Sequence, residues 1–192
     1  EFNIDYVYLD NQKKIKTLKS ILPKDVVILN ESGLKDYLNN TTSDLSILAV
    51  SGYESLKYLE PICINTNKIG IVSKEAIVSA GHILKSISNK YNTKIFPLDS
   101  EHFSIFQNFN KIKIDSSNLK KIYITASGGP FINKKFNLLT NVSFKEATNH
   151  PKWKMGYKNS IDSATLVNKC LELVEAHYLF DISFTNLDIL IH

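Results

Sequence analysis

Short apolar runs alternate with amphipathic stretches over residues 1–98. The apolar runs are each short enough to form a single strand, and they lie at residues 6–9, 26–29, 45–50, 69–72 and 95–98. The stretches between them repeat apolar residues at helical spacing, most clearly near 34–38, 55–59 and 76–89. Continuous apolar strands that alternate with helices predict an α/β fold with a doubly wound parallel sheet.

The hydrophobic pattern changes after Leu98. The elements predicted beyond it are a helix, a strand, a second helix and a last strand, at 102–109, 122–125, Ser163–Leu179 and 187–192. Residues 131–158 are mostly polar, and such a segment is a candidate for a mobile flap. We therefore expect one domain at 1–98 and a second, α+β domain at 99–192.

Composition narrows the possible classes of function. The net charge of +4 is spread thinly, without a run of five Lys or Arg, so nucleic-acid binding is disfavoured. No apolar stretch approaches the ~20 residues that span a bilayer, so no membrane partner is expected. Cys63 and Cys170 form no CxxC pair, and Cys63 is expected to fill a core. The seven glycines cannot form a GxGxxG fingerprint, so either the fold binds no nucleotide or its first strand–loop–helix precedes residue 1.

Two carboxylates follow the last apolar run of the first domain, in the motif Asp99-Ser100-Glu101-His102. Asp99 and Glu101 point to one side if the backbone stays extended, so both can reach one cation. A third oxygen ligand would come from Glu172, or from Glu175 one helical turn later. The alternatives are solvated carboxylates and a surface salt bridge between Lys169 and Glu172.

Candidate anion-binding groups lie between these acidic motifs. Ser127-Gly128-Gly129 follows a predicted strand, where bare backbone N–H groups can cradle an anion; a plain turn is the alternative. Ser163 is predicted to open a helix whose N-terminus attracts phosphate, or to cap that helix without a ligand. Oxygen ligands together with phosphate-binding groups predict a metal-dependent enzyme that acts on a small phosphorylated substrate.

In order along the chain, these motifs resemble those of 1-deoxy-D-xylulose 5-phosphate reductoisomerase. The resemblance is strongest from Lys68 to His192, and the motifs that carry it are Ser73-Lys74-Glu75, Asp99-Ser100-Glu101-His102, Ala126-Ser127-Gly128-Gly129-Pro130-Phe131, His150-Pro151-Lys152-Trp153-Lys154-Met155-Gly156, Asp162–Thr165 and Asn168-Lys169 with Leu171-Glu172. It implies that 1–98 is the remainder of an NADPH-binding, Rossmann-like domain and that 99–192 is a catalytic domain binding metal and substrate, with its flap at 131–158.

The resemblance also implies a reaction, its cofactors and its residues. This family rearranges 1-deoxy-D-xylulose 5-phosphate and reduces the product with NADPH, giving 2-C-methyl-D-erythritol 4-phosphate for isoprenoid synthesis. A divalent cation (Mg, Mn or Co) would be held by Asp99, Glu101 and Glu172. Catalytic roles would fall to Lys74, Glu101 and Glu172. Substrate contacts would come from Lys74, Ser100, Ser127, His150, Trp153, Ser163, Asn168, Lys169 and Glu172, and cofactor contacts from Ser73, Glu75, Met155 and Gly156.

Several residues depart from the family pattern. Ser73 stands where asparagine is usual, and Glu54 and Ser55 replace a small residue and a glycine, which is expected to crowd the cofactor loop at Gly52. Cys170 replaces a glycine, and Phe103 replaces a smaller or polar residue. None of these changes removes a metal or phosphate group, so they affect the expected NADPH contacts most.

The family's N-terminal glycine-rich loop and C-terminal helical domain have no counterpart in this sequence, which reads as a fragment. We therefore expect most of the active site but only part of the cofactor site, and a homodimer for the full-length protein. The resemblance implies a bacterial cytoplasm or a plastid as the location. A catalytically silent homologue that only binds metal and phosphosugar is the first alternative, and an unrelated two-domain dehydrogenase is the second.

Overall fold

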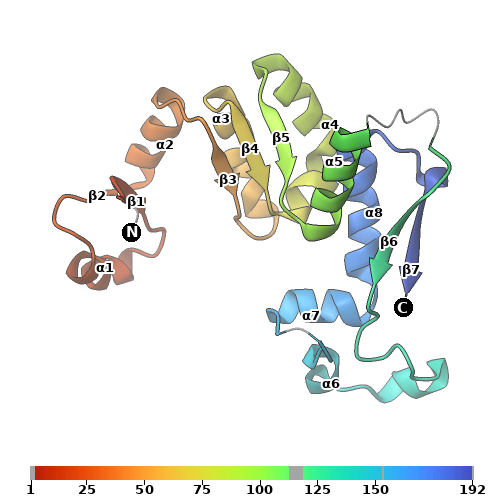
Figure 1. Cartoon of the computed structure of the whole chain (residues 1–192). Coiled ribbons are helices and arrows are strands. Elements are labelled where there is room, and N and C mark those ends of the chain that lie inside the picture. The colour runs from red at the N-terminus through yellow and green to blue at the C-terminus, as the bar shows by residue number, and fades with distance from the viewer. Residues whose placement is uncertain (1–2, 113–118, 153, 192) are drawn as a thin grey trace.

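The computed structural model describes residues 3–112, 119–152 and 154–191, which form three small parallel sheets flanked by helices (Figure 1). Every strand pair recorded in this part of the chain is parallel, and helices connect the paired strands. The predicted α/β class is therefore confirmed. No helix among the described residues combines the length and the apolar character that a membrane crossing requires.

The N-terminal sheet consists of β1 (Tyr6–Tyr8) and β2 (Val27–Leu29), connected by a 3-10 turn at Gln12–Lys14 and by α1 (Ile15–Ile21). α2 (Glu31–Asn40) follows, and Figure 1 shows this unit at one end of the molecule. The side chain of Asn30 accepts a hydrogen bond from the Gly33 amide at 2.8 Å. Because this bond satisfies a backbone donor at the helix start, it explains why α2 begins there.

The central sheet has the strand order β3 (Ser46–Leu48), β4 (Lys68–Ile71) and β5 (Lys94–Pro97). A 3-10 turn at Tyr53–Ser55 and α3 (Leu56–Ile64) connect β3 to β4, and α4 (Lys74–Tyr91) connects β4 to β5. Apolar side chains of the strands and of both helices form one core, whose buried members are Leu48, Leu59, Cys63, Ile69, Ile71, Ala76, Ile77, Ala80 and Leu84. The prediction that Cys63 fills a core is confirmed.

The C-terminal part begins with α5 (Ser100–Ile112) and contains the third sheet, β6 (Ile122–Ala126) with β7 (Leu187–Ile191). The remaining elements are 3-10 turns at Phe136–Asn141 and Phe184–Asn186 and the helices α6 (Phe144–Thr148), α7 (Tyr157–Ala164) and α8 (Val167–Phe180). α8 packs against α4, α5 and both strands of this sheet, so one helix joins the central sheet to the third sheet.

The single helix predicted from Ser163 to Leu179 is wrong, because the chain forms two helices there. α7 ends at Ala164, Leu166 takes the left-handed conformation with φ of 60°, and α8 begins at Val167. The Thr165 hydroxyl donates to the carbonyl of Ile161 at 3.0 Å, which closes the end of α7. Ser163 therefore lies at the C-terminal end of a helix, and the helix N-terminus near the site belongs to α8.

Candidate functional site

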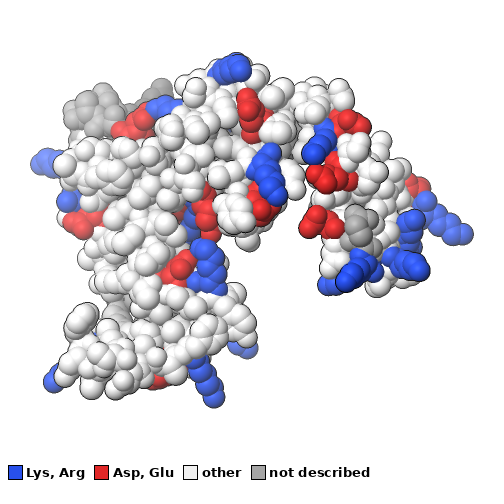
Figure 2. Space-filling model, turned by 180° about the vertical axis from the view of Figure 1, so that it is seen from behind, with Lys and Arg blue, Asp and Glu red and all other residues white. Residues whose placement is uncertain are grey.

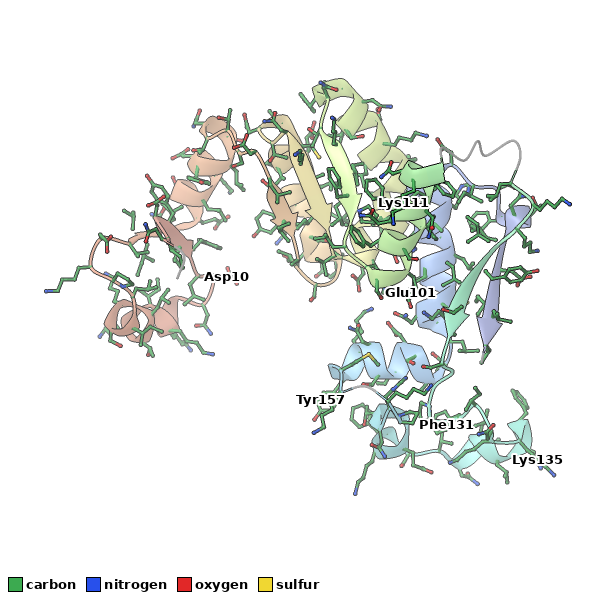
Figure 3. The ribbon with its side chains drawn as sticks, in the orientation of Figure 1. Asp10, Glu101, Lys111, Phe131, Lys135 and Tyr157 are labelled. Carbon is green, nitrogen blue, oxygen red and sulfur yellow. The ribbon has the colours of Figure 1, made fainter. Side chains whose placement is uncertain are left out.

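A cavity of about 530 Å³ lies where β5 and β6 end and where α4, α5 and α8 begin. The carboxyl ends of parallel strands are the usual place for a ligand in this fold class. Eleven residues predicted for the site line it, namely Lys74, Asp99, Ser100, Glu101, Ser127, His150, Met155, Ser163, Asn168, Lys169 and Glu172. Figure 3 shows Glu101 at the start of α5, on the side of the molecule that faces α7 and its first residue Tyr157.

Three carboxylates meet on one wall of the cavity. Asp99, Glu101 and Glu172 each place one oxygen so that all three lie within 4.8 Å of one another. The predicted reason was wrong, since the backbone is not extended after Asp99: α5 begins at Ser100, and the Asp99 carboxylate accepts a hydrogen bond from the Glu101 amide at 3.2 Å. A tight helix start brings the two side chains together instead.

Two ammonium groups lie among these carboxylates. Lys74 Nζ contacts Asp99 and lies 3.4 Å from Glu172 Oε1 and 3.5 Å from Glu175 Oε2. Lys169 Nζ lies 2.5 Å from Glu101 Oε1 and 2.7 Å from Glu172 Oε2. Burial lowers the pKa of each lysine, but the neighbouring carboxylates outweigh burial and hold both pKa values above the ordinary one. The salt bridge between Lys169 and Glu172 that the sequence suggested is present, but it is nearly buried and does not lie on the surface.

His102 is a site residue that the sequence reasoning did not assign. Its ring is fully buried, with Nδ1 3.1 Å from Asp99 Oδ1 and Nε2 2.9 Å from the backbone carbonyl of Glu172. Both partners offer oxygen acceptors, so the protonated imidazole can donate a hydrogen bond from each ring nitrogen. Burial lowers the pKa of His102, yet the Asp99 hydrogen bond and the Glu175 charge raise it overall. Its position three residues after Asp99, on the same face of a helix, was the available signal.

Glu175 lies one turn beyond Glu172 on α8 and is 1% exposed. Burial raises the pKa of its carboxyl to about 7, although Lys74 and His102 act in the opposite direction. Asp99 behaves differently, because its hydrogen bond to His102 and its contact with Lys74 outweigh burial and lower its pKa. The site thus contains one carboxyl held firmly ionised beside one that resists ionisation.

The opposite wall of the cavity carries neutral hydrogen-bonding groups and the N-terminus of α8. Ser127 and Gly128 follow β6 directly, as predicted, and Gly128 has φ of 79°. At Gly129 a Cβ would lie 2.6 Å from the Ser163 carbonyl oxygen, so only glycine lets this loop approach the end of α7. That close contact brings Ser127 and Ser163 to one cavity. Asn168 in the first turn of α8 also lines this cavity, and its side-chain amide donates a hydrogen bond to Glu172.

Three predicted cofactor residues do not line this cavity. Ser73 and Glu75 hydrogen-bond to each other at 3.2 Å, and Glu75 also pairs with Lys158 at 2.8 Å. Gly156 precedes α7 and has open space around it. Their role in cofactor binding stays a prediction, and Trp153, predicted to contact substrate, lies outside the described residues.

The loop predicted for the cofactor is open at Gly52. Its φ is 72°, and no heavy atom lies within 4 Å of a Cβ built there, so a ligand can approach the backbone closely. Ser55 does not crowd this loop, contrary to expectation. Its side chain is fully buried, donates to the Gly52 carbonyl at 2.7 Å and lies 3.1 Å from the Ser73 hydroxyl.

The wall of carboxylates also suits a divalent cation chemically. Carboxylate oxygens are hard ligands of the kind that magnesium and manganese prefer. In the view of Figure 2, acidic and basic side chains intermingle over the described surface. The fold and the cavity therefore define an α/β protein whose cavity combines carboxylates suited to a cation with hydrogen-bond donors suited to an anion.

Comparison with known proteins agrees with this class and names a family. Residues 95–180 match the model of the 1-deoxy-D-xylulose 5-phosphate reductoisomerase C-terminal domain. The reductoisomerase of Pelagibacter ubique is 40% identical over 100% of this chain and 50% of its own length. The apicoplastic enzyme of Plasmodium falciparum is 35% identical over 97% of this chain and 40% of its own length.

Solved structures give the same result. A DOX-P reductoisomerase in complex with NADPH, fosmidomycin and magnesium superimposes with a TM-score of 0.83 at 34% identity, covering 97% of this chain and 48% of that one. The Zymomonas mobilis enzyme in complex with NADPH gives 0.83 at 31% identity, with the same coverage. This chain is a homologue of the 1-deoxy-D-xylulose 5-phosphate reductoisomerases. It spans about half the length of the curated relatives that it matches.

Proposed function

We propose that the protein carrying this chain converts 1-deoxy-D-xylulose 5-phosphate to 2-C-methyl-D-erythritol 4-phosphate with NADPH and a divalent cation. The observation that supports this most directly is the cavity itself. Three carboxylate oxygens that lie within 4.8 Å of one another line the same cavity of about 530 Å³ as Ser127, Ser163 and the start of α8. A phosphorylated sugar needs both walls, because its carbonyl and hydroxyl oxygens suit the cation and its phosphate suits the hydrogen-bond donors.

Asp99, Glu101 and Glu172 would hold the cation, which is Mg, Mn or Co. When bound, the cation supplies Lewis-acid stabilisation of negative charge on the substrate oxygens. His102 fixes two of these ligands, since it bonds the Asp99 side chain and the Glu172 backbone at once. Such a buried partner orients a ligand before the cation arrives. Lys74 and Ser100 line the cavity next to these carboxylates and would contact substrate oxygens.

The phosphate would lie against the opposite wall. Ser127 and Ser163 offer hydroxyl groups there. The side-chain amide of Asn168, which donates to Glu172 in the structure, would turn to the phosphate. The N-terminus of α8 adds the positive end of the helix dipole. His150 and Lys169 line the same cavity and would complete the phosphate site.

The NADPH site would lie on the side of the central sheet, within a doubly wound domain at 1–98. Gly52 would permit close approach to the backbone, and Met155 would contact the nicotinamide side from the segment 131–158. We propose that this segment is the flap of the catalytic domain 99–192, that Trp153 and Met155 exclude water before hydride transfer, and that Gly156 contacts the cofactor. Ser73 and Glu75 would position α4 beside the cofactor.

One observation favours a silent, binding-only homologue. Ser73 and Glu75 already bond within the protein and leave fewer groups for a cofactor. An activity assay distinguishes the two functions. The protein expressed from its complete reading frame is incubated with 1-deoxy-D-xylulose 5-phosphate, Mn²⁺ and NADPH, and nicotinamide oxidation is followed with the Glu172→Gln variant as the control. Oxidation that requires Glu172 supports the enzyme, whereas substrate binding without oxidation supports the silent homologue.

A further inference from the structure

Lys169 reaches from the first turn of α8 into the acidic cluster and not toward the phosphate wall. Its ammonium bonds Glu101 at 2.5 Å and Glu172 at 2.7 Å, and its side chain is only 12% exposed. Both partners belong to the three carboxylates that form the candidate cation site. The ammonium therefore occupies two of the carboxylates that a divalent cation requires.

Two ammonium groups already lie in the cluster. The carboxyl groups of Asp99, Glu101, Glu172 and Glu175 surround Lys74 and Lys169, and each ammonium lies within 3.5 Å of at least two of them. A divalent cation held by Asp99, Glu101 and Glu172 would lie beside both ammonium groups in a mostly buried place. Like charges repel strongly where water is excluded, so cation binding favours the release of one ammonium group.

Lys169 is the group best placed to leave. His102 is fixed by bonds from both ring nitrogens, and Lys74 keeps Glu175 as a partner outside the Asp99–Glu101–Glu172 set. Lys169 bonds only members of that set, and Glu101 is its more exposed partner, at 27%. Its flexible stem lines the same cavity as Ser127 and Ser163, so the released ammonium remains within that cavity.

We propose that Lys169 is an exchangeable counter-ion that couples the two walls of the cavity. It bonds Glu101 and Glu172 while the cation is absent, and it turns to the phosphate once a divalent cation takes those carboxylates. The inference rests on the proposed function, since it takes one wall as the cation site and the other as the phosphate site. Linkage makes the effect reciprocal, so phosphate must strengthen cation binding by the same factor.

The test is calorimetric titration of the 192-residue chain with inorganic phosphate, without Mg²⁺ and at saturating Mg²⁺, corrected by a protein-free blank. In the wild type, Mg²⁺ should raise phosphate affinity at least about fivefold, the lower end of usual coupling. In Lys169→Met, Mg²⁺ should bind more tightly than in the wild type, because no ammonium has to be displaced. Phosphate should bind that variant more weakly, with a response to Mg²⁺ below about twofold.

Lys152→Met is the matched control, because Lys152 lines the same cavity and the structure records no ion pair for its ammonium among the described residues. It should keep the coupling of the wild type. Unchanged or weaker Mg²⁺ binding in Lys169→Met would overturn the proposal and make the lysine a structural ion-pair partner. The wild-type titrations decide the matter even if that variant does not fold. Independent binding of Mg²⁺ and phosphate overturns this inference alone, whereas no Mg²⁺ binding overturns the proposed function as well.

Discussion

Replacing Glu175 with glutamine should stabilise the metal-free protein at pH 8 and change its stability much less at pH 5. Glu175 is 1% exposed, and its Oε2 lies 3.5 Å from Lys74 Nζ and 3.8 Å from His102 Nδ1. Burial raises the pKa of the carboxyl from 4.5 to about 7, because the two cations offset only part of the cost of burial. The variant replaces this carboxyl with a neutral amide, so it removes a buried charge that destabilises the folded state.

The sign and size of the effect follow from proton linkage. The folded state binds the Glu175 proton more tightly than the unfolded chain does, so protonation favours folding. The stability gained in this way is fully present below pH 4.5 and is lost as the pH rises through about 7. At about 1.4 kcal/mol per pKa unit, the whole loss is about 3 kcal/mol. Glutamine is neutral at every pH, so the variant avoids the loss.

The assay is urea denaturation of the wild type and Glu175→Gln at pH 5 and pH 8 in the presence of a chelator. Glu60→Gln serves as the control, because Glu60 is exposed on α3 and its replacement should change stability by no more than about 0.5 kcal/mol at either pH. If Glu175→Gln differs from the wild type by the same amount at both pH values, Glu175 is ionised in the folded protein throughout this range. The electrostatic account of the buried cluster would then be wrong.

Three further predictions test other parts of the structure. Glu172→Gln should weaken Mn²⁺ binding at least about tenfold, and unchanged affinity in calorimetry would remove Glu172 from the cation site. Gly129→Ala places a Cβ 2.6 Å from the Ser163 carbonyl oxygen and should lower the free energy of unfolding by about 1–3 kcal/mol. Thermal melting measures this loss, and a melting temperature equal to that of the wild type would contradict the close contact. Lys158 pairs with both Glu75 and Asp162 at 2.8 Å, so charge removal is a cleaner test than charge reversal. Glu75→Gln and Lys158→Met should each destabilise slightly, with a coupling of no more than about 1 kcal/mol in a double-mutant cycle; a larger coupling would contradict a partly exposed pair.

The sequence predicted elements well where the pattern is local. The apolar runs at 26–29 and 69–72 match β2 and β4 closely, and Ser127 follows β6 as expected. The break between α7 and α8 was missed, because the residues around Leu166 continue a helical pattern. The break coincides with the left-handed conformation of Leu166, and Gly129 approaches Ser163 just before it; no local spacing reveals either feature.

For the candidate site, the sequence by itself determined which chemical groups are available and which strand or helix ends carry them. Asp99, Glu101 and Glu172 were predicted from the motifs, and the structure places them together. Only the tertiary structure decided which cations face these carboxylates. Lys169 and Glu101 are 68 positions apart in the sequence, and Lys74 and Glu175 are 101 positions apart. Both pairs are in contact because α8 packs against α4 and α5. Local spacing sets which face of a helix a side chain occupies, but charge balance and pKa depend on the helices packed against that face.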